Sequence, residues 1–154
     1  MRYFYYPGCS MESTADTYKR SFEYVASKIG MELIEIPDWN CCGATAAHSI
    51  SDWMALSLPA RNLAMAEKEG LDLDVAVPCA ACYSRLRYTV HEARRDENTR
   101  KNIEKIIGMP YRAKNDVLTI LEIFTRDEVM EACKKQIVRS LNGLKVACYY
   151  GCLT

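Results

Sequence analysis

The sequence predicts an α/β fold, a small parallel sheet of about four strands flanked by helices. Short β-rich segments alternate with helical segments along the chain, which is typical of βα units. The 154 residues, 49% of them hydrophobic, are enough for one globular domain with its own core. No linker or low-complexity segment interrupts the pattern. Several cysteines also follow the predicted strands directly, which places them at the carboxyl ends of those strands.

Four strands are predicted. Residues 2–6 are aromatic and end at a Pro-Gly pair, residues 31–36 alternate apolar and acidic side chains, and residues 73–77 form a short apolar run closed by proline. A fourth strand is expected at residues 144–149, after an Asn-Gly turn.

Helices are predicted between and after these strands. From Ser13 onward apolar residues recur at three- and four-residue spacing, and Gly30 is a natural stop. Further helices are predicted at residues 49–69, 80–95, 116–124 and 125–141, with the charged stretch 94–105 as a solvated helix surface. Pro59 is expected to kink or divide the helix at 49–69.

The charge balance and the N-terminal segment exclude several classes of protein. Twenty basic and 20 acidic residues give a net charge of zero, which argues against nucleic acid or an anionic membrane surface as the partner. No apolar run approaches the roughly 18 residues of a membrane span, and residues 1–12 lack the features of a secretory signal. We therefore expect a cytoplasmic protein, in which eight cysteines more often bind metal or carry out redox chemistry than form disulfides.

Five of the cysteines follow predicted strands. Cys9 follows the first strand, the adjacent pair Cys41 and Cys42 follows the second, and Cys79 and Cys82 follow the third. Because the carboxyl ends of parallel strands share one edge of a sheet, we expect these side chains to converge. Thiolates gathered from separate loops favour a soft metal ion, which neutralises their charge.

The spacing of these cysteines leaves more than one kind of site open. A redox pair at Cys79 and Cys82 would not need three more cysteines nearby. Adjacent side chains such as Cys41 and Cys42 project divergently, which suits an iron–sulfur cluster with several metal atoms better than one ion. A four-cysteine zinc site is the alternative.

Other residues have weaker functional interpretations, and no catalytic residue is assigned. His48, six residues after the adjacent cysteines, is a candidate proton donor to a leaving thiolate, against a role in helix capping or surface hydrogen bonding. Arg85 and Arg87 are candidates to contact an anionic substrate or partner, although two arginines on a helix are ordinarily solvated. Cys133 and Cys148 are expected to pack in the core.

The cysteine pattern resembles that of a known family. Thirty-one residues separate Cys9 from Cys41 of the Cys41-Cys42-Gly43 motif, and 36 residues separate Cys42 from Cys79 of Cys79-Ala80-Ala81-Cys82. This arrangement resembles the cysteine-rich CCG domain found in the B-type subunit of heterodisulfide reductase and its relatives. The resemblance extends to Pro7-Gly8-Cys9, Cys42-Gly43-Ala44, Ala60-Arg61-Asn62-Leu63-Ala64 and Tyr150-Gly151-Cys152.

The resemblance implies a component of an iron–sulfur oxidoreductase. Cys9, Cys41, Cys42, Cys79 and Cys82 would bind a noncubane [4Fe-4S] cluster that takes part in disulfide reduction or electron transfer, with other iron–sulfur subunits as partners and a small disulfide as a candidate substrate. In aerobic preparations we expect the cluster to be lost or replaced by zinc. The alternative function is a non-catalytic zinc-binding interaction domain that uses the same cysteines.

The resemblance also implies a division of the chain. The family's reductases carry two tandem CCG domains and cleave a disulfide between the two clusters. We interpret residues 1–143 as one CCG domain and residues 144–154 as the first strand and first cysteine, Cys152, of a second, truncated repeat. The chain alone is therefore expected to be inactive and to self-associate.

Overall fold

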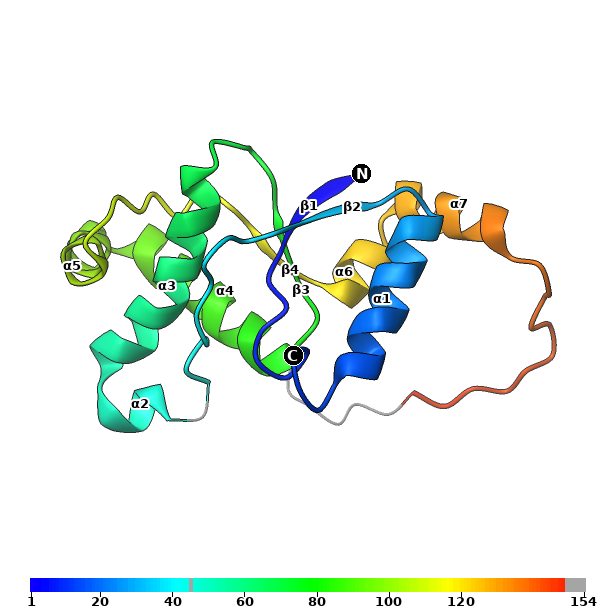
Figure 1. Cartoon of the computed structure of the whole chain (residues 1–154), viewed down its shortest axis with the longest axis horizontal. Helices are drawn as coiled ribbons and strands as arrows, with labels where there is room; N and C mark the ends of the chain where they lie inside the picture. The colour runs from blue at the N-terminus through cyan, green and yellow to red at the C-terminus, as the bar shows by residue number, and fades with distance from the viewer. Residues whose placement is uncertain (45, 149–154) are drawn as a thin grey trace.

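The computed structural model describes residues 1–44 and 46–148. A four-stranded, all-parallel sheet lies at its centre (Figure 1). The strands are β1 (Arg2–Tyr5), β2 (Glu32–Glu35), β3 (Val75–Val77) and β4 (Val117–Thr119), in the spatial order β2-β1-β3-β4. This arrangement confirms the predicted α/β fold class.

The alternation of side chains along the first strand builds a core on each face of the sheet. Phe4 and Tyr6 pack into one cluster, whereas Tyr3 and Tyr5 pack into the other. Helices α3 (Asp52–Lys68), α4 (Ala80–Arg95) and α5 (Glu97–Ile107) contribute to the first cluster, and α1 (Asp16–Lys28), α6 (Ile120–Phe124) and α7 (Asp127–Gln136) contribute to the second. Figure 1 shows these two sets of helices on opposite sides of the sheet.

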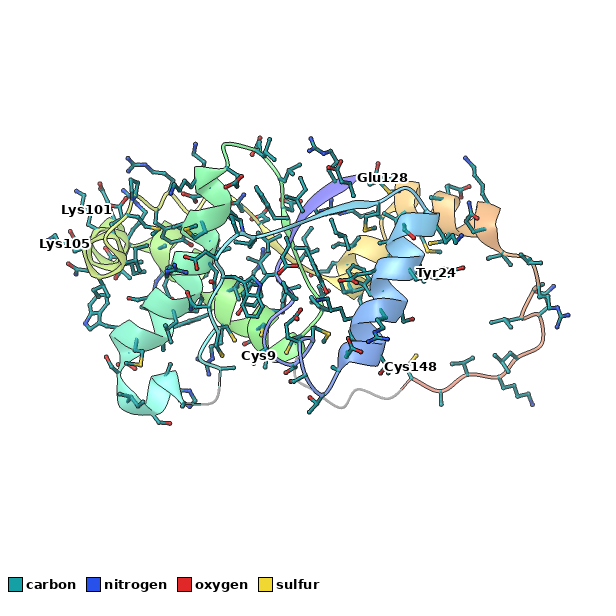
Figure 2. The ribbon with its side chains drawn as sticks, viewed as in Figure 1. Cys9, Tyr24, Lys101, Lys105, Glu128 and Cys148 are labelled. Carbon is teal, nitrogen blue, oxygen red and sulfur yellow. The ribbon has the colours of Figure 1, made fainter. Side chains whose placement is uncertain are left out.

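Most of the predicted helices are confirmed, with shifted ends. The helix after Ser13 is α1, and the helix with Pro59 in its interior is the undivided α3, preceded by the short α2 (Ala47–Ile50). The charged stretch contains α5, which begins where the Asp96 carboxylate accepts hydrogen bonds from two backbone N–H groups. Lys101 and Lys105 project outward from this helix, as expected for a solvated surface (Figure 2).

The predicted helix at residues 116–124 is wrong in its first part, because residues 117–119 form β4. Val117 is fully buried and pairs with Val75 of β3. The helix α6 begins only after Thr119, whose hydroxyl accepts a hydrogen bond from the backbone N–H of Glu122 while its own N–H donates to the Glu122 carboxylate. A three-residue strand is too short to show the period-two pattern of a strand.

The strand predicted at residues 144–149 is not formed over residues 144–148, and Tyr149 lies outside the described residues. Residues 144–148 are exposed and pair with no strand within the described part of the chain. The fourth strand of the sheet is β4 instead. After α7 the chain runs as an open loop beside the helices (Figure 1). The interpretation of residues 144–154 as the start of a second repeat stays a prediction, and Cys152 also lies outside the described residues.

The two cysteines expected in the core behave differently. Cys133 is half-buried and packs against the second core cluster, in agreement with the prediction. Cys148 is exposed, so its assignment to the core is wrong. The error has the same cause as the missing strand, because without a sheet neighbour the segment has no buried face.

Candidate metal centre

The candidate centre lies at the carboxyl edge of the sheet. From β1 the chain passes outward to β2 and then returns across β1 to β3, so the strand order reverses between β1 and β3. Open α/β sheets form ligand sites at such a reversal, outside the carboxyl ends of the strands. Cys9 follows β1 and Cys79 follows β3, on the two sides of this point, and Cys41 and Cys42 follow the neighbouring β2.

The five strand-end cysteines meet as two groups of sulfur atoms. The Cys9 and Cys41 sulfurs are 3.9 Å apart and exposed, and Figure 2 shows Cys9 at the edge of the sheet. The Cys42 and Cys82 sulfurs are 3.2 Å apart and buried, and the half-buried Cys79 is close enough to Cys82 to influence its protonation. The adjacent Cys41 and Cys42 therefore point to different partners from one position in the chain.

Two glycines allow the cysteine loops to approach one another. Gly8 has a φ of +73°, and a Cβ atom at this position would lie 2.9 Å from the Cys82 sulfur. Gly43 has a φ of +72°, and a Cβ atom there would lie 2.7 Å from the Ala47 Cβ and 2.8 Å from the Leu58 Cδ1. Any side chain at either glycine would meet a neighbour at the site and strain the backbone.

A buried asparagine holds the backbone just before the adjacent cysteines. Asn62 of α3 is fully buried, its Oδ1 accepts a hydrogen bond from the Asn40 N–H at 2.8 Å, and its Nδ2 donates to the Asn40 carbonyl at 2.9 Å. Arg61 donates to the Asp38 carbonyl and to the Asn40 Oδ1. The role of Asn62 was not predicted, although an asparagine between the apolar Ala60 and Leu63 was a signal in the sequence.

Aromatic side chains close the sheet side of the centre. Tyr6 is fully buried, its hydroxyl donates to the Asn40 carbonyl at 2.8 Å, and its ring packs edge-on against Trp39 with centroids 5.5 Å apart. Burial raises the pKa of Tyr6, with a further contribution from the neighbouring Cys42, so the hydroxyl stays protonated and remains a donor.

Hydrogen bonding divides the buried thiols into thiolates and a donor. A hydrogen bond from the Cys82 thiol, supported by the backbone N–H groups of Cys82 and Ala81 and by the side chain of Ser10, lowers the pKa of Cys79 to about 5. A hydrogen bond with Cys82 also lowers the pKa of Cys42 to about 7. The pKa of Cys82 is raised in turn, because its proton is shared with these two sulfurs. Cys79 and Cys42 thus favour the thiolate, which is the form that binds metal.

The donor chemistry of this centre fits an iron–sulfur cluster, for which cysteine thiolates are the usual ligands. Among the described residues, no three or more His, Cys, Asp or Glu side chains surround one position as they would a single metal ion. The sulfurs are instead divided between the Cys9–Cys41 pair and the group around Cys82.

The remaining candidates lie beside this centre. His48 is exposed on α2, and the described residues contain no hydrogen bond between it and a cysteine. Arg87 contacts the Asp116 carboxylate at 3.8 Å, whereas Arg85 lines a cavity together with His48. In residues 1–44 and 46–148, no helix combines the length and apolar character needed to cross a membrane.

Comparison with known proteins identifies similar chains. Residues 3–87, which contain all five strand-end cysteines, match the family described as CCG, cysteine-rich domain. The chain is 32% identical to the membrane anchor subunit of the 8-methylmenaquinol:fumarate reductase of Wolinella succinogenes, over 96% of this chain and 51% of that protein. It is 27% identical to a protein of Archaeoglobus profundus that is named for its likeness to the B-type subunit of heterodisulfide reductase, over 99% and 52% of the two chains. It is 26% identical to the B-type subunit of the ferredoxin:CoB-CoM heterodisulfide reductase of Methanosarcina mazei, over 94% and 49%.

The chain therefore spans about half the length of the curated relatives it matches. One of these relatives is named a membrane anchor, so the cytoplasmic location expected from the sequence stays a prediction.

Proposed function

Because the chain belongs to the cysteine-rich CCG domain family, as its cysteine spacing predicted, we propose that it is the cluster-binding part of an iron–sulfur reductase similar to heterodisulfide reductase. In this proposal Cys9, Cys41, Cys42, Cys79 and Cys82 bind a noncubane [4Fe-4S] cluster that takes part in disulfide reduction or electron transfer. The relatives named above are subunits of reductases, which supports a role with partner subunits in a larger complex.

The observation that carries the proposal is the divergence of two adjacent cysteines. Cys41 lies 3.9 Å from Cys9 on the exposed side, and Cys42 lies 3.2 Å from Cys82 on the buried side. Two neighbouring thiols that point to separate sulfur partners suit a multi-metal cluster better than one tetrahedral ion.

The protein's own residues would control access to such a cluster. When bound, the cluster supplies single electrons and iron sites with affinity for the sulfur of a cleaved disulfide. Tyr6 is fully buried next to these cysteines, and its hydroxyl holds the loop before Cys41 through a hydrogen bond to the Asn40 carbonyl. Cys9 and Cys41 face solvent, so a substrate or partner would approach from their side.

Metal analysis tests the proposal directly. After anaerobic reconstitution with iron and sulfide, we expect about four iron and four sulfide per chain and a paramagnetic cluster signal. Aerobic preparations should show loss of iron, with zinc or disulfides in its place. One zinc per chain after the anaerobic preparation, with no sulfide and no cluster signal, would refute the proposal in favour of a zinc-binding interaction domain.

Single cysteine variants distinguish a five-ligand cluster from a four-ligand site. Cys41→Ser and Cys42→Ser should each abolish or strongly reduce the iron and sulfide content. Cys133→Ser is the matched control, because Cys133 packs against the second core cluster on α7 and should leave the metal content unchanged. Full metal content in both Cys41→Ser and Cys42→Ser would contradict the five-ligand assignment.

Self-association of the isolated chain is part of the proposal. The segment 137–148 exposes five apolar side chains, Ile137, Val138, Leu141, Leu144 and Val146, each more than half accessible to solvent. Light scattering over a concentration series should detect dimers or larger species, and a mass that stays monomeric throughout would contradict this part.

A further inference from the structure

A polar cavity lies beside the cysteine centre, between α2, α3 and α4. Its volume is about 430 Å³, within the roughly 300–1,000 Å³ that small-molecule sites occupy. Its lining includes His48 of α2, Asp52 at the start of α3, and Ser84, Arg85 and Tyr88 of α4. Four of these five side chains carry hydrogen-bond donors.

Arg85 is unusual among the arginines of this chain. The chain has eleven arginines. Nine of them form ion pairs with Asp or Glu: Arg2, Arg20, Arg61, Arg87, Arg94, Arg95, Arg100, Arg112 and Arg126. Arg139 lies exposed after α7, whereas Arg85 is half-buried and has neither an ion pair nor a hydrogen bond within the described residues.

An unpaired, half-buried guanidinium at a cavity is a recognition group for an oxyanion. Its planar fork of donors matches a carboxylate, phosphate or sulfonate in a bidentate arrangement. Asp52 lines the same cavity, but it forms no ion pair with Arg85 among the described residues. The N-terminus of α3, where Asp52 stands, favours a negative charge and accounts for this carboxylate without Arg85.

The cavity adjoins the cysteines through two elements. Arg85 follows Cys82 by three residues on α4, a rise of about 4.5 Å along the helix. His48 directly follows Ala47, whose Cβ lies against Gly43. An anion bound to Arg85 would therefore lie on the same helix as Cys82, about one turn further along.

From these observations we infer that the cavity binds the oxyanion group of a small molecule, with Arg85 as the principal contact and with Ser84 and Tyr88 as hydroxyl donors. The inference goes beyond the proposed function and does not depend on it. Binding of the anion itself needs no cluster. The concave lining and the volume favour a small molecule over a carboxylate side chain of a partner protein.

Titration of the isolated chain with inorganic phosphate tests the inference. In a buffer of low ionic strength, we expect saturable shifts of the Arg85 Nε–H signal in ¹H–¹⁵N spectra. Arg85→Gln should weaken phosphate binding about tenfold or more. Arg87→Gln, which removes the same charge from the same helix, should leave it unchanged, and Asp52→Asn should tighten it by removing a nearby negative charge.

The outcomes separate this inference from the proposed function. Equal weakening by Arg85→Gln and Arg87→Gln would show only general charge attraction and would overturn the inference. Absence of binding to the isolated chain would overturn it as well and would favour a protein carboxylate as the partner of Arg85. Iron and sulfide are measured on reconstituted samples of the same variants. Arg85-dependent phosphate binding in a chain that takes up no cluster would support the anion site and refute the proposed function.

Discussion

Replacement of Asn62 by alanine should destabilise the protein and weaken the metal centre without changing a cysteine. Asn62 is fully buried and binds both backbone groups of Asn40, the residue before Cys41. In Asn62→Ala both hydrogen bonds are lost. The Asn40 carbonyl keeps the Tyr6 hydroxyl as a donor, but the Asn40 N–H has no remaining partner among the described residues.

The magnitude follows from these contacts. Two hydrogen bonds contribute about 1 kcal/mol each, and an unpaired N–H in a half-buried position costs about 1–2 kcal/mol more, so the free energy of unfolding should fall by about 3–4 kcal/mol. Native domains have only about 5–15 kcal/mol of stability, so the loss is large. Asn102→Ala is the matched control, because Asn102 is a half-buried helical asparagine of α5 whose side chain makes no hydrogen bond within the described chain.

Urea unfolding followed by circular dichroism measures both variants in the reduced, metal-free state. Anaerobic reconstitution then measures iron and sulfide, which should fall in Asn62→Ala and stay at the wild-type level in Asn102→Ala. If the unfolding free energies of the two variants agree within about 0.5 kcal/mol, the hydrogen bonds to Asn40 do not hold the cysteine loop, and the reasoning is refuted.

Two further predictions concern the glycine contact and the thiol pKa values. Gly8→Ala and Gly30→Ala both place alanine at a positive φ, at a cost of about 1–2 kcal/mol each. Only Gly8→Ala also places a Cβ atom 2.9 Å from the Cys82 sulfur. Gly30→Ala is the control, because nothing lies within 4 Å of the Cβ position at Gly30. Urea unfolding and iron content should therefore show the larger loss in Gly8→Ala, and equal losses would contradict the close contact. In the reduced, metal-free protein the pKa of Cys79 is lowered to about 5, chiefly by the hydrogen bond from Cys82. Because its thiolate is already formed above that pH, the alkylation rate of Cys79, measured by peptide mass spectrometry, should stay constant between about pH 7 and pH 8; a rate that rises across this range would argue against the lowered pKa.

Local patterns were sufficient for the features that depend on near neighbours in the chain. The apolar pattern within β1, β3 and α1 predicts, from a few consecutive residues, the type of each element and whether it is buried on one face or on two. The positions of Cys9, Cys42 and Cys79 after strands follow from the same patterns. A parallel sheet brings strand ends to one edge, so the cysteine cluster was predictable before any contact was known.

The errors arose where a segment depends on a distant partner. Residues 117–119 form a strand because Val117 pairs with Val75, more than 40 positions away, and three residues are too few to show this locally. The apolar alternation at 144–148 resembles a strand, but a strand is stable only beside a neighbour, and the described chain provides none.

The sequence by itself determined the fold class, the family and the five cysteines at one edge of the sheet, because spacing along the chain and strand direction are local properties. Only the tertiary structure decided which sulfurs meet, Cys9 with Cys41 and Cys42 with Cys82. It also decided that Asn62 holds the loop between β2 and these cysteines, and that Arg85 faces a cavity without a carboxylate partner in the described chain. These features are contacts between residues far apart in sequence, which depend on how the layers pack.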